Sequence, residues 1–164
     1  MALLLRQIRK SKWYKTKEVN WLRTGELQAD ALGDITTSSN SLSLWEITDD
    51  HTNLEAVVTA LAAGRIAASN FDFALFTKTS IAENDIKITE AVGKTVDERV
   101  NEFHRELIEL STGKLLALAK IIQENAKRER FMEPKILTLI SDAIKDGRFN
   151  LDVLSENIRN RLQK

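Results

Sequence analysis

The spacing of apolar residues changes near residue 90, and this change limits the folds that are open to the chain. Up to about Thr89, short strand-like and helix-like segments alternate, whereas from Thr95 onward the spacing is almost wholly helical. The sequence therefore predicts an α+β protein with a small three- or four-stranded sheet and one or two helices, followed by a C-terminal set of three or four amphipathic helices. We assign residues 1–92 to the sheet-containing part and residues 93–164 to a helical part packed on it, as one compact unit.

Four segments of the first half have the composition and length of strands. Leu42 and Leu44 alternate with polar neighbours, at the interval of two that is typical of a half-buried strand. Thr52 and Glu55 have the spacing of a capping box, so a helix is expected to follow them and to end near Gly64. Strand, helix and strand in succession permit a parallel crossover, and the last two strands are expected to form a hairpin. The expected strands are Leu3–Ile8, Leu42–Ile47, 71–76 and 86–88.

The helical half is expected to contain helices that each carry one apolar stripe. Thr95 and Glu98 form a second capping box, at the start of the first of these helices. Pro134 suits the first turn of a later helix, and Asn150 can cap the last one. Such helices must pack on one another, on the sheet or on a partner. The stripes are Val100, Phe103, Leu107 and Leu110; Leu115, Leu118, Ala119 and Ile122; Ile136, Leu139, Ile140 and Ala143; and Leu151, Leu154, Ile158 and Leu162.

Charge is balanced over the whole chain but separated along its first third. The sequence has 24 Lys and Arg against 24 Asp and Glu. Residues 1–24 carry seven cations and one anion, whereas residues 25–60 carry seven anions and neither Lys nor Arg. A polarised surface steers charged partners, so the separation favours a function in macromolecular interaction.

A basic segment with interleaved aromatic residues is the main candidate for binding. Its cations can neutralise phosphates while Trp13 or Tyr14 stacks on an unpaired base, which would make it a nucleic-acid site. Alternatively, it binds a protein partner, or it is a solvated strand end whose aromatic rings pack into the core. It can also lie against the acidic stretch that follows, which includes Glu46, Asp49 and Asp50. The candidate binding residues are Arg9, Lys10, Lys12, Trp13, Tyr14 and Lys15.

Acidic side chains and an imidazole lie together after the second expected strand. Asp49, Asp50 and His51, close to Glu46 in the sequence, have the donor atoms for a divalent cation or for acid and base catalysis. Acidic residues just before a helix also stabilise its positive end, and that role explains Asp49 and Asp50 without any catalytic function.

Arg99 and His104 have the spacing Arg-x4-His. In this they resemble HEPN-type ribonucleases, which are helical bundles with such a pair in the active site, and the resemblance implies cleavage of RNA by these two residues. It is confined to this pair, and Val100 stands where that family usually has a polar residue. On a continuous helix, five positions correspond to about 500°, so the two side chains diverge by roughly 140°. A partly buried, hydrogen-bonded His104 beside Phe103 explains the same residues.

The composition excludes several kinds of site. The chain has no Cys and two His, which excludes disulfides, thiolate nucleophiles and His-rich zinc sites. Its glycines follow no phosphate-binding pattern, so we expect neither a resident metal nor a cofactor. The apolar runs are too short to cross a bilayer and the lack of Cys fits a reducing compartment, so we expect a cytoplasmic protein without membrane contact.

The function expected from these observations is binding rather than catalysis. We expect a macromolecular-interaction or regulatory module that binds a protein partner, or that self-associates as an oligomer. The alternative is a nucleic-acid-binding protein or a small nuclease, in which the catalytic residues come from Arg99, His104, Asp49, Asp50 and His51.

Overall fold

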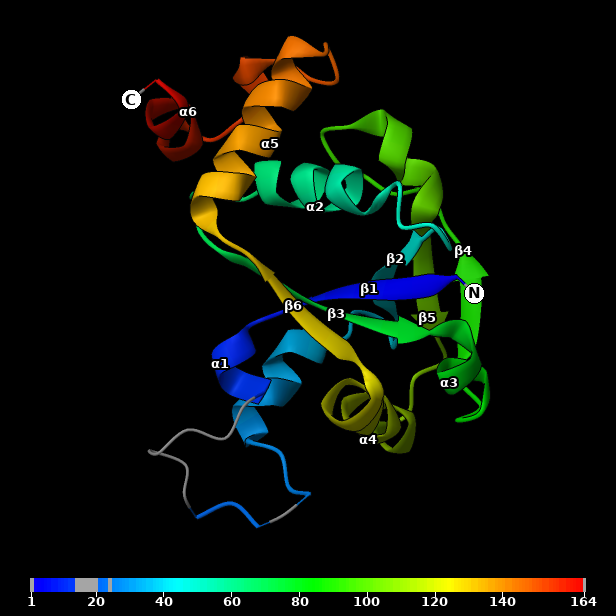
Figure 1. The fold of residues 1–164 in the computed structure, drawn as a ribbon. Coiled ribbons are helices and arrows are strands. Elements are labelled where there is room, and N and C mark those ends of the chain that lie inside the picture. The colour runs from blue at the N-terminus through cyan, green and yellow to red at the C-terminus, as the bar shows by residue number, and fades with distance from the viewer. Residues whose placement is uncertain (1, 14–20, 24, 164) are drawn as a thin grey trace.

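One six-stranded sheet lies at the centre of the fold and carries helices on both of its faces (Figure 1). The computed structural model describes residues 2–13, 21–23 and 25–163. Each hydrogen-bonded pair of strands is antiparallel. From edge to edge, the strands are β4 (Lys87–Glu90), β5 (His104–Ile108), β2 (Leu42–Ile47), β1 (Leu3–Ile8), β3 (Phe71–Thr77) and β6 (Lys127–Phe131).

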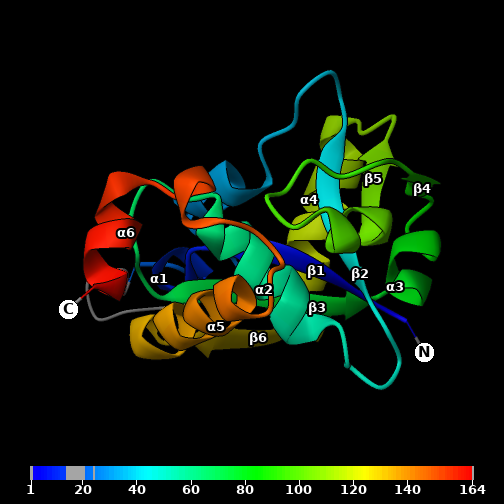
Figure 2. The ribbon, with the colours of Figure 1, turned by 90° about the horizontal axis from the view of Figure 1, so that it is seen from above.

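Two groups of helices cover the two faces. One face carries α2 (Leu54–Ala63), the 3₁₀ helix η3 (Glu98–Phe103), α5 (Glu133–Lys145), the 3₁₀ turn η5 (Leu151–Val153) and α6 (Glu156–Leu162). Figure 2 looks down on this layer and shows α5 beside α2. The other face carries α1 (Lys10–Trp13), the 3₁₀ helix η2 (Ala29–Ile35), α3 (Lys78–Ala82), α4 (Thr112–Lys120) and the π-helical turn η4 (Ile121–Asn125). In the part of the chain described here, no helix has the length and apolar character needed to cross a membrane.

Alternate residues of the central strands point into two separate hydrophobic cores. On β3, Phe71, Phe73 and Leu75 belong to the core beneath α2 and α5, whereas Ala74 and Phe76 belong to the core beneath α4. Because both faces are covered, β3 is a nearly continuous apolar run rather than an alternating one. Each fully buried Leu or Phe contributes roughly 1.5–3 kcal/mol, so the two layers supply most of the stabilisation.

The sheet splits between β1 and β2. The two strands pair from Leu3 to Leu5, which lies opposite Trp45, but beyond this point β1 pairs only with β3. The Arg6 side chain fills the gap: Nη1 donates to the carbonyl oxygen of Ser43 at 2.9 Å, and Nε donates to that of Asp34 at 3.0 Å. Burial lowers the pKa of the Arg6 guanidinium, while the nearby Asp34 carboxylate acts in the opposite direction.

The α+β class is confirmed, but the predicted layout is wrong. The sheet has six strands rather than three or four, and helices alternate with strands rather than forming a C-terminal set. Two strands, β5 and β6, come from residues 93–164, where only helices were expected, and both pair with strands from residues 1–92. Pairing with the sheet therefore outweighed the local helical spacing of Phe103 and Leu107.

Two smaller predictions are also corrected. The expected hairpin of the third and fourth strands does not form, because α3 leads the chain away and β4 pairs with β5 at the edge of the sheet. β2 and β3 do run in the same direction, but β1 lies between them. The capping box at Thr52 does not form, because Thr52 Oγ1 donates to Asp50 at 2.9 Å and Asn53 occupies the N-cap position.

Candidate functional site

The basic segment at the start of the chain folds onto Asp34 of η2. The backbone N–H of Arg9 donates to Asp34 Oδ2 at 2.7 Å, and Arg9 Nε donates to Oδ1 at 2.5 Å. The indole N–H of Trp13 donates to Oδ2 at 2.8 Å. One buried carboxylate therefore collects three donors from this segment.

These contacts bury the aromatic residue of the described segment but leave Arg9 more than half exposed. Trp13 is buried, Lys12 is half-buried, and the Trp13 carbonyl oxygen accepts a hydrogen bond from Arg128 Nη1 at 3.0 Å. The side chain of Lys10, together with Tyr14 and Lys15, lies outside the described residues. The described part of the basic segment therefore packs against the acidic stretch that follows, and its partner there is Asp34.

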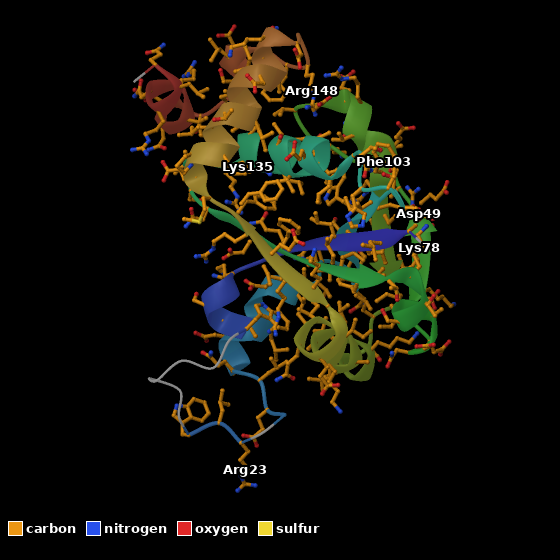
Figure 3. The ribbon with its side chains drawn as sticks, in the orientation of Figure 1. Arg23, Asp49, Lys78, Phe103, Lys135 and Arg148 are labelled. Carbon is orange, nitrogen blue, oxygen red and sulfur yellow. The ribbon has the colours of Figure 1, made fainter. Side chains whose placement is uncertain are left out.

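Asp49, Asp50 and His51 form the turn between β2 and α2. Asp50 accepts hydrogen bonds from the Thr48 hydroxyl at 2.8 Å and from the backbone N–H of Thr52 at 3.2 Å, and these bonds lower the pKa of its carboxyl group. His51 has a φ of 59°, a left-handed conformation that is uncommon for residues other than glycine. Figure 3 shows Asp49 on the outside of this end of the sheet, near Lys78.

Neither a metal site nor the nuclease pair is assembled among the residues that the structure describes. No three His, Asp or Glu side chains come together there in a way that could hold a metal ion. Arg99 lies in a hollow beside Asp97 and Arg148, whereas His104 lies on β5 and lines a different hollow. His104 Nδ1 is 3.2 Å from the carbonyl oxygen of Ala91, and its ring lies 5.0 Å from that of Trp45.

An apolar hollow of about 560 Å³ lies on the α4 side of the molecule, and we call it the α4 hollow. One wall is formed by α4 and the start of η4. Leu118 and Ala119 of this helix belong to the core, whereas Leu116, Lys120 and Gln123 recur at i, i+4 and i+7 and line the hollow beside Ala119. Leu116 is 51% exposed, although a residue on an apolar helical stripe is usually covered.

The opposite wall is the segment that leads into η2. It presents Trp21, which is 67% exposed, and the partly buried Leu27 and Leu32. A turn at residues 23–26 shapes this wall: the N–H of Glu26 donates to the carbonyl oxygen of Arg23 at 3.2 Å, and Gly25 has a φ of 85°. In Figure 3, Arg23 points away from the fold at the outer end of this segment, so its charge lies outside the hollow.

A polar group without a partner lies at the base of the α4 hollow. Gln123 Nε2 donates to the carbonyl oxygen of Glu26 at 3.1 Å and so connects the two walls. Its Oε1 is buried and finds no donor among the described residues. An unmet acceptor costs about 1–3 kcal/mol, and Gln123 lies in the π-helical turn η4, a distortion that is frequent at functional sites.

The α4 hollow was not predicted, because it joins two segments that are about 90 residues apart in sequence. The sequence offers only one apolar residue as a signal for it, Leu116, since Lys120 and Gln123 are polar and Ala119 belongs to the stripe that enters the core. A lone exposed Trp21 carries no such signal, since single apolar residues on a surface are common.

The comparisons with known proteins give no relative for this chain. No protein-family model matches it, and neither a curated protein nor a solved structure matches it. Its function must therefore be argued from its own residues.

Proposed function

We propose that this protein is a non-enzymatic interaction or regulatory module of the cell interior, and that it binds a partner protein through the α4 hollow. The observation that carries the proposal is the pair Trp21 and Leu116, two large apolar side chains that face one concave surface while more than half exposed. Contiguous exposed apolar surface around a concavity is a property of protein-binding sites.

The exposed aromatic side chain alone can supply substantial binding energy. A buried aromatic residue removes roughly 150–250 Å² from water, so covering the two-thirds of Trp21 that is exposed removes roughly 100–170 Å². At about 25 cal/mol per Å², this amounts to roughly 2.5–4 kcal/mol before the cost of association. A tryptophan in a desolvated pocket is also the commonest kind of hot spot in protein interfaces.

The chemistry of the α4 hollow favours a protein over a nucleic acid. Among the residues that the structure describes, its walls carry one cation, Lys120, and one anion, Glu26, whereas nucleic-acid interfaces are strongly basic. An apolar side chain of the partner would fill the space beside Leu116 and Leu32.

The test is site-specific photo-crosslinking in cells of the source organism. A benzophenone amino acid replaces Leu116 in one variant and Ile66 in a control. Ile66 is 87% exposed, but it follows α2 on the opposite face of the sheet. We expect a defined crosslinked protein from position 116, none from position 66, and at least tenfold less product when Trp21→Ser is added, which corresponds to about 1.4 kcal/mol.

The size of the product distinguishes the partners. A product of twice the chain mass identifies a second copy, and sedimentation velocity must then show a dimer that Leu116→Glu dissociates. A product containing another protein identifies a heterologous partner. Equal labelling from positions 116 and 66, or crosslinks to nucleic acid alone, would overturn the proposal.

A further inference from the structure

We propose that a second hollow, at the split between β1 and β2, binds a small zwitterion with a primary ammonium and a carboxylate group, that is, a free amino acid or a close analogue. This strand-split hollow has a volume of about 470 Å³ and lies on the α2 face of the sheet, opposite to the α4 hollow. Pockets of this size hold small ligands. Its polar and aromatic lining includes a third charged group, the partly buried Arg6 side chain, besides Lys94 and Glu106, and its other members are Gln7, Ser43, Trp45, Thr95 and His104.

Three hydrogen-bond acceptors lie close together on two neighbouring strands. Ser43 on β2 is directly opposite Glu106 on β5, and His104 is two residues from Glu106 on the same face of the sheet. Opposite residues are about 5 Å apart, and residues two apart on a strand are about 6.7 Å apart. A primary ammonium group has three N–H donors, so a hydroxyl, a carboxylate and an imidazole at this spacing match it.

The Nε2 atom of His104 accepts rather than donates a hydrogen bond. The residue is 7% exposed, and Nδ1 lies 3.2 Å from the carbonyl oxygen of Ala91, so in the neutral ring Nδ1 carries the proton. Nε2 is then an acceptor, and none of the described residues donates to it. This nitrogen is open to the hollow, so the ammonium group of a ligand can donate to it.

Two opposite charges in the strand-split hollow are uncompensated. Glu106 and Lys94 both line it, and among the described residues neither forms an ion pair with the other or with a third group. A zwitterion compensates both charges, with its ammonium at Glu106 and its carboxylate at Lys94. A phosphate is disfavoured because it would lie beside the Glu106 carboxylate, and because Arg6 already donates to the carbonyl oxygens of Asp34 and Ser43.

The wall that carries Lys94 is held in place by backbone and side-chain contacts. The N–H of Gly93 donates to the Asn101 carbonyl oxygen at 3.0 Å, and the N–H of Thr95 donates to Asn101 Oδ1 at 2.9 Å. A Cβ on Gly93 would lie 2.6 Å from the Trp45 ring, so only glycine allows this contact. Because this wall is already ordered before the ligand binds, the entropy cost of binding is reduced. Leu61 also lines the hollow and supplies apolar surface for the side chain of the ligand.

Isothermal titration calorimetry on the full chain tests this inference. The probes are the twenty free amino acids, and each one that binds is compared with its N-acetyl and carboxamide derivatives. We expect at least one free amino acid to bind and both of its derivatives to bind at least tenfold more weakly. Glu106→Gln and Lys94→Gln should each weaken binding about tenfold or more. The control variants are Glu109→Gln and Lys87→Gln, which break an exposed ion pair at the same edge of the sheet. Each control should change the affinity less than twofold.

Three results would overturn the inference: no saturable binding of any free amino acid below about 10 mM, equal binding of the blocked derivatives, or equal binding to the Glu106 and Lys94 variants. Inorganic phosphate is the additional probe, and tighter binding of phosphate to Glu106→Gln, without amino-acid binding to the wild type, would identify an anion site instead. Circular dichroism of each variant verifies its folding. If Glu106→Gln fails to fold, Ser43→Ala serves in its place, because the Ser43 side chain is exposed.

Discussion

Replacement of Arg148 by methionine should destabilise the fold far more than the same replacement of Arg99. Both arginines donate to Asp97, whose side chain is fully buried. Arg148 Nε lies 2.6 Å from Asp97 Oδ2 and its side chain is 16% exposed, whereas Arg99 Nε lies 3.3 Å from Oδ1 and its side chain is 61% exposed. The contact joins the end of α5 to the start of η3, and Figure 3 places Arg148 there.

The magnitudes follow from the burial of the two arginines. Removing one partner of a buried ion pair lowers the free energy of unfolding by about 3–5 kcal/mol, because the remaining carboxylate stays buried without a close cation. An exposed pair contributes about 0–1 kcal/mol. For a chain of this size, Arg148→Met should lower the melting temperature by roughly 6–20 °C and Arg99→Met by no more than a few degrees. Methionine keeps most of the aliphatic packing, so the difference reports the charge.

Urea unfolding followed by circular dichroism measures both variants and the double variant Asp97→Asn/Arg148→Met. The double variant should recover part of the loss, because it no longer buries an unpaired charge. Equal free energies of unfolding for Arg148→Met and Arg99→Met, with the same dependence on urea, would refute the assignment of Asp97 and Arg148 as a stabilising buried pair.

Three further predictions concern residues outside this ion pair. Asp34→Asn should lower the free energy of unfolding by roughly 2–3 kcal/mol in urea titrations, because it weakens charge-assisted bonds from Trp13 and the basic segment; a loss below about 0.5 kcal/mol would contradict this. The pKa of Asp50, measured by NMR, should lie below the usual carboxyl value. Because the pKa of Asp50 is lower in the folded than in the unfolded state, this carboxylate stabilises the fold at a pH above the unfolded-state pKa. That contribution to stability is lost as the pH falls through the folded-state pKa. Gly93→Ala should cost about 1–3 kcal/mol because its Cβ meets the Trp45 ring, whereas an unchanged melting temperature would show that the loop yields.

The strands that the sequence predicted are those with strong local patterns. β1 and β2 have the predicted bounds, and β3 extends one residue beyond the prediction. β3 is apolar on both sides because helices cover both faces of the sheet, so its identity depends on composition rather than on periodicity. α5 was also predicted correctly, with Pro134 in its first turn, since proline at that position costs no hydrogen bond.

The strands that the sequence did not predict depend on contacts with distant residues. Val100 and Leu107 have helical spacing, but Val100 enters the α2 core and Leu107 the α4 core, because β5 begins between them. β6 contains Lys127 to Arg130 in succession and resembles an exposed helix end in sequence. It is an edge strand, where charges prevent further pairing, and Arg130 forms a bidentate ion pair with Asp72 on β3.

The charge separation in the first third of the chain is explained in part by the fold itself. The charge of a segment determines the sign of the charge on its partner but not the identity of that partner. The sequence therefore allowed the basic segment to bind nucleic acid, a protein or the chain's own acidic stretch. Arg9 and Asp34 are 25 positions apart, and closing a loop of that length costs only a few kcal/mol of entropy, without the further cost of bringing two molecules together. A buried carboxylate with three donors offsets that cost, so part of the charge separation is used inside the fold, at the contact between the basic segment and Asp34.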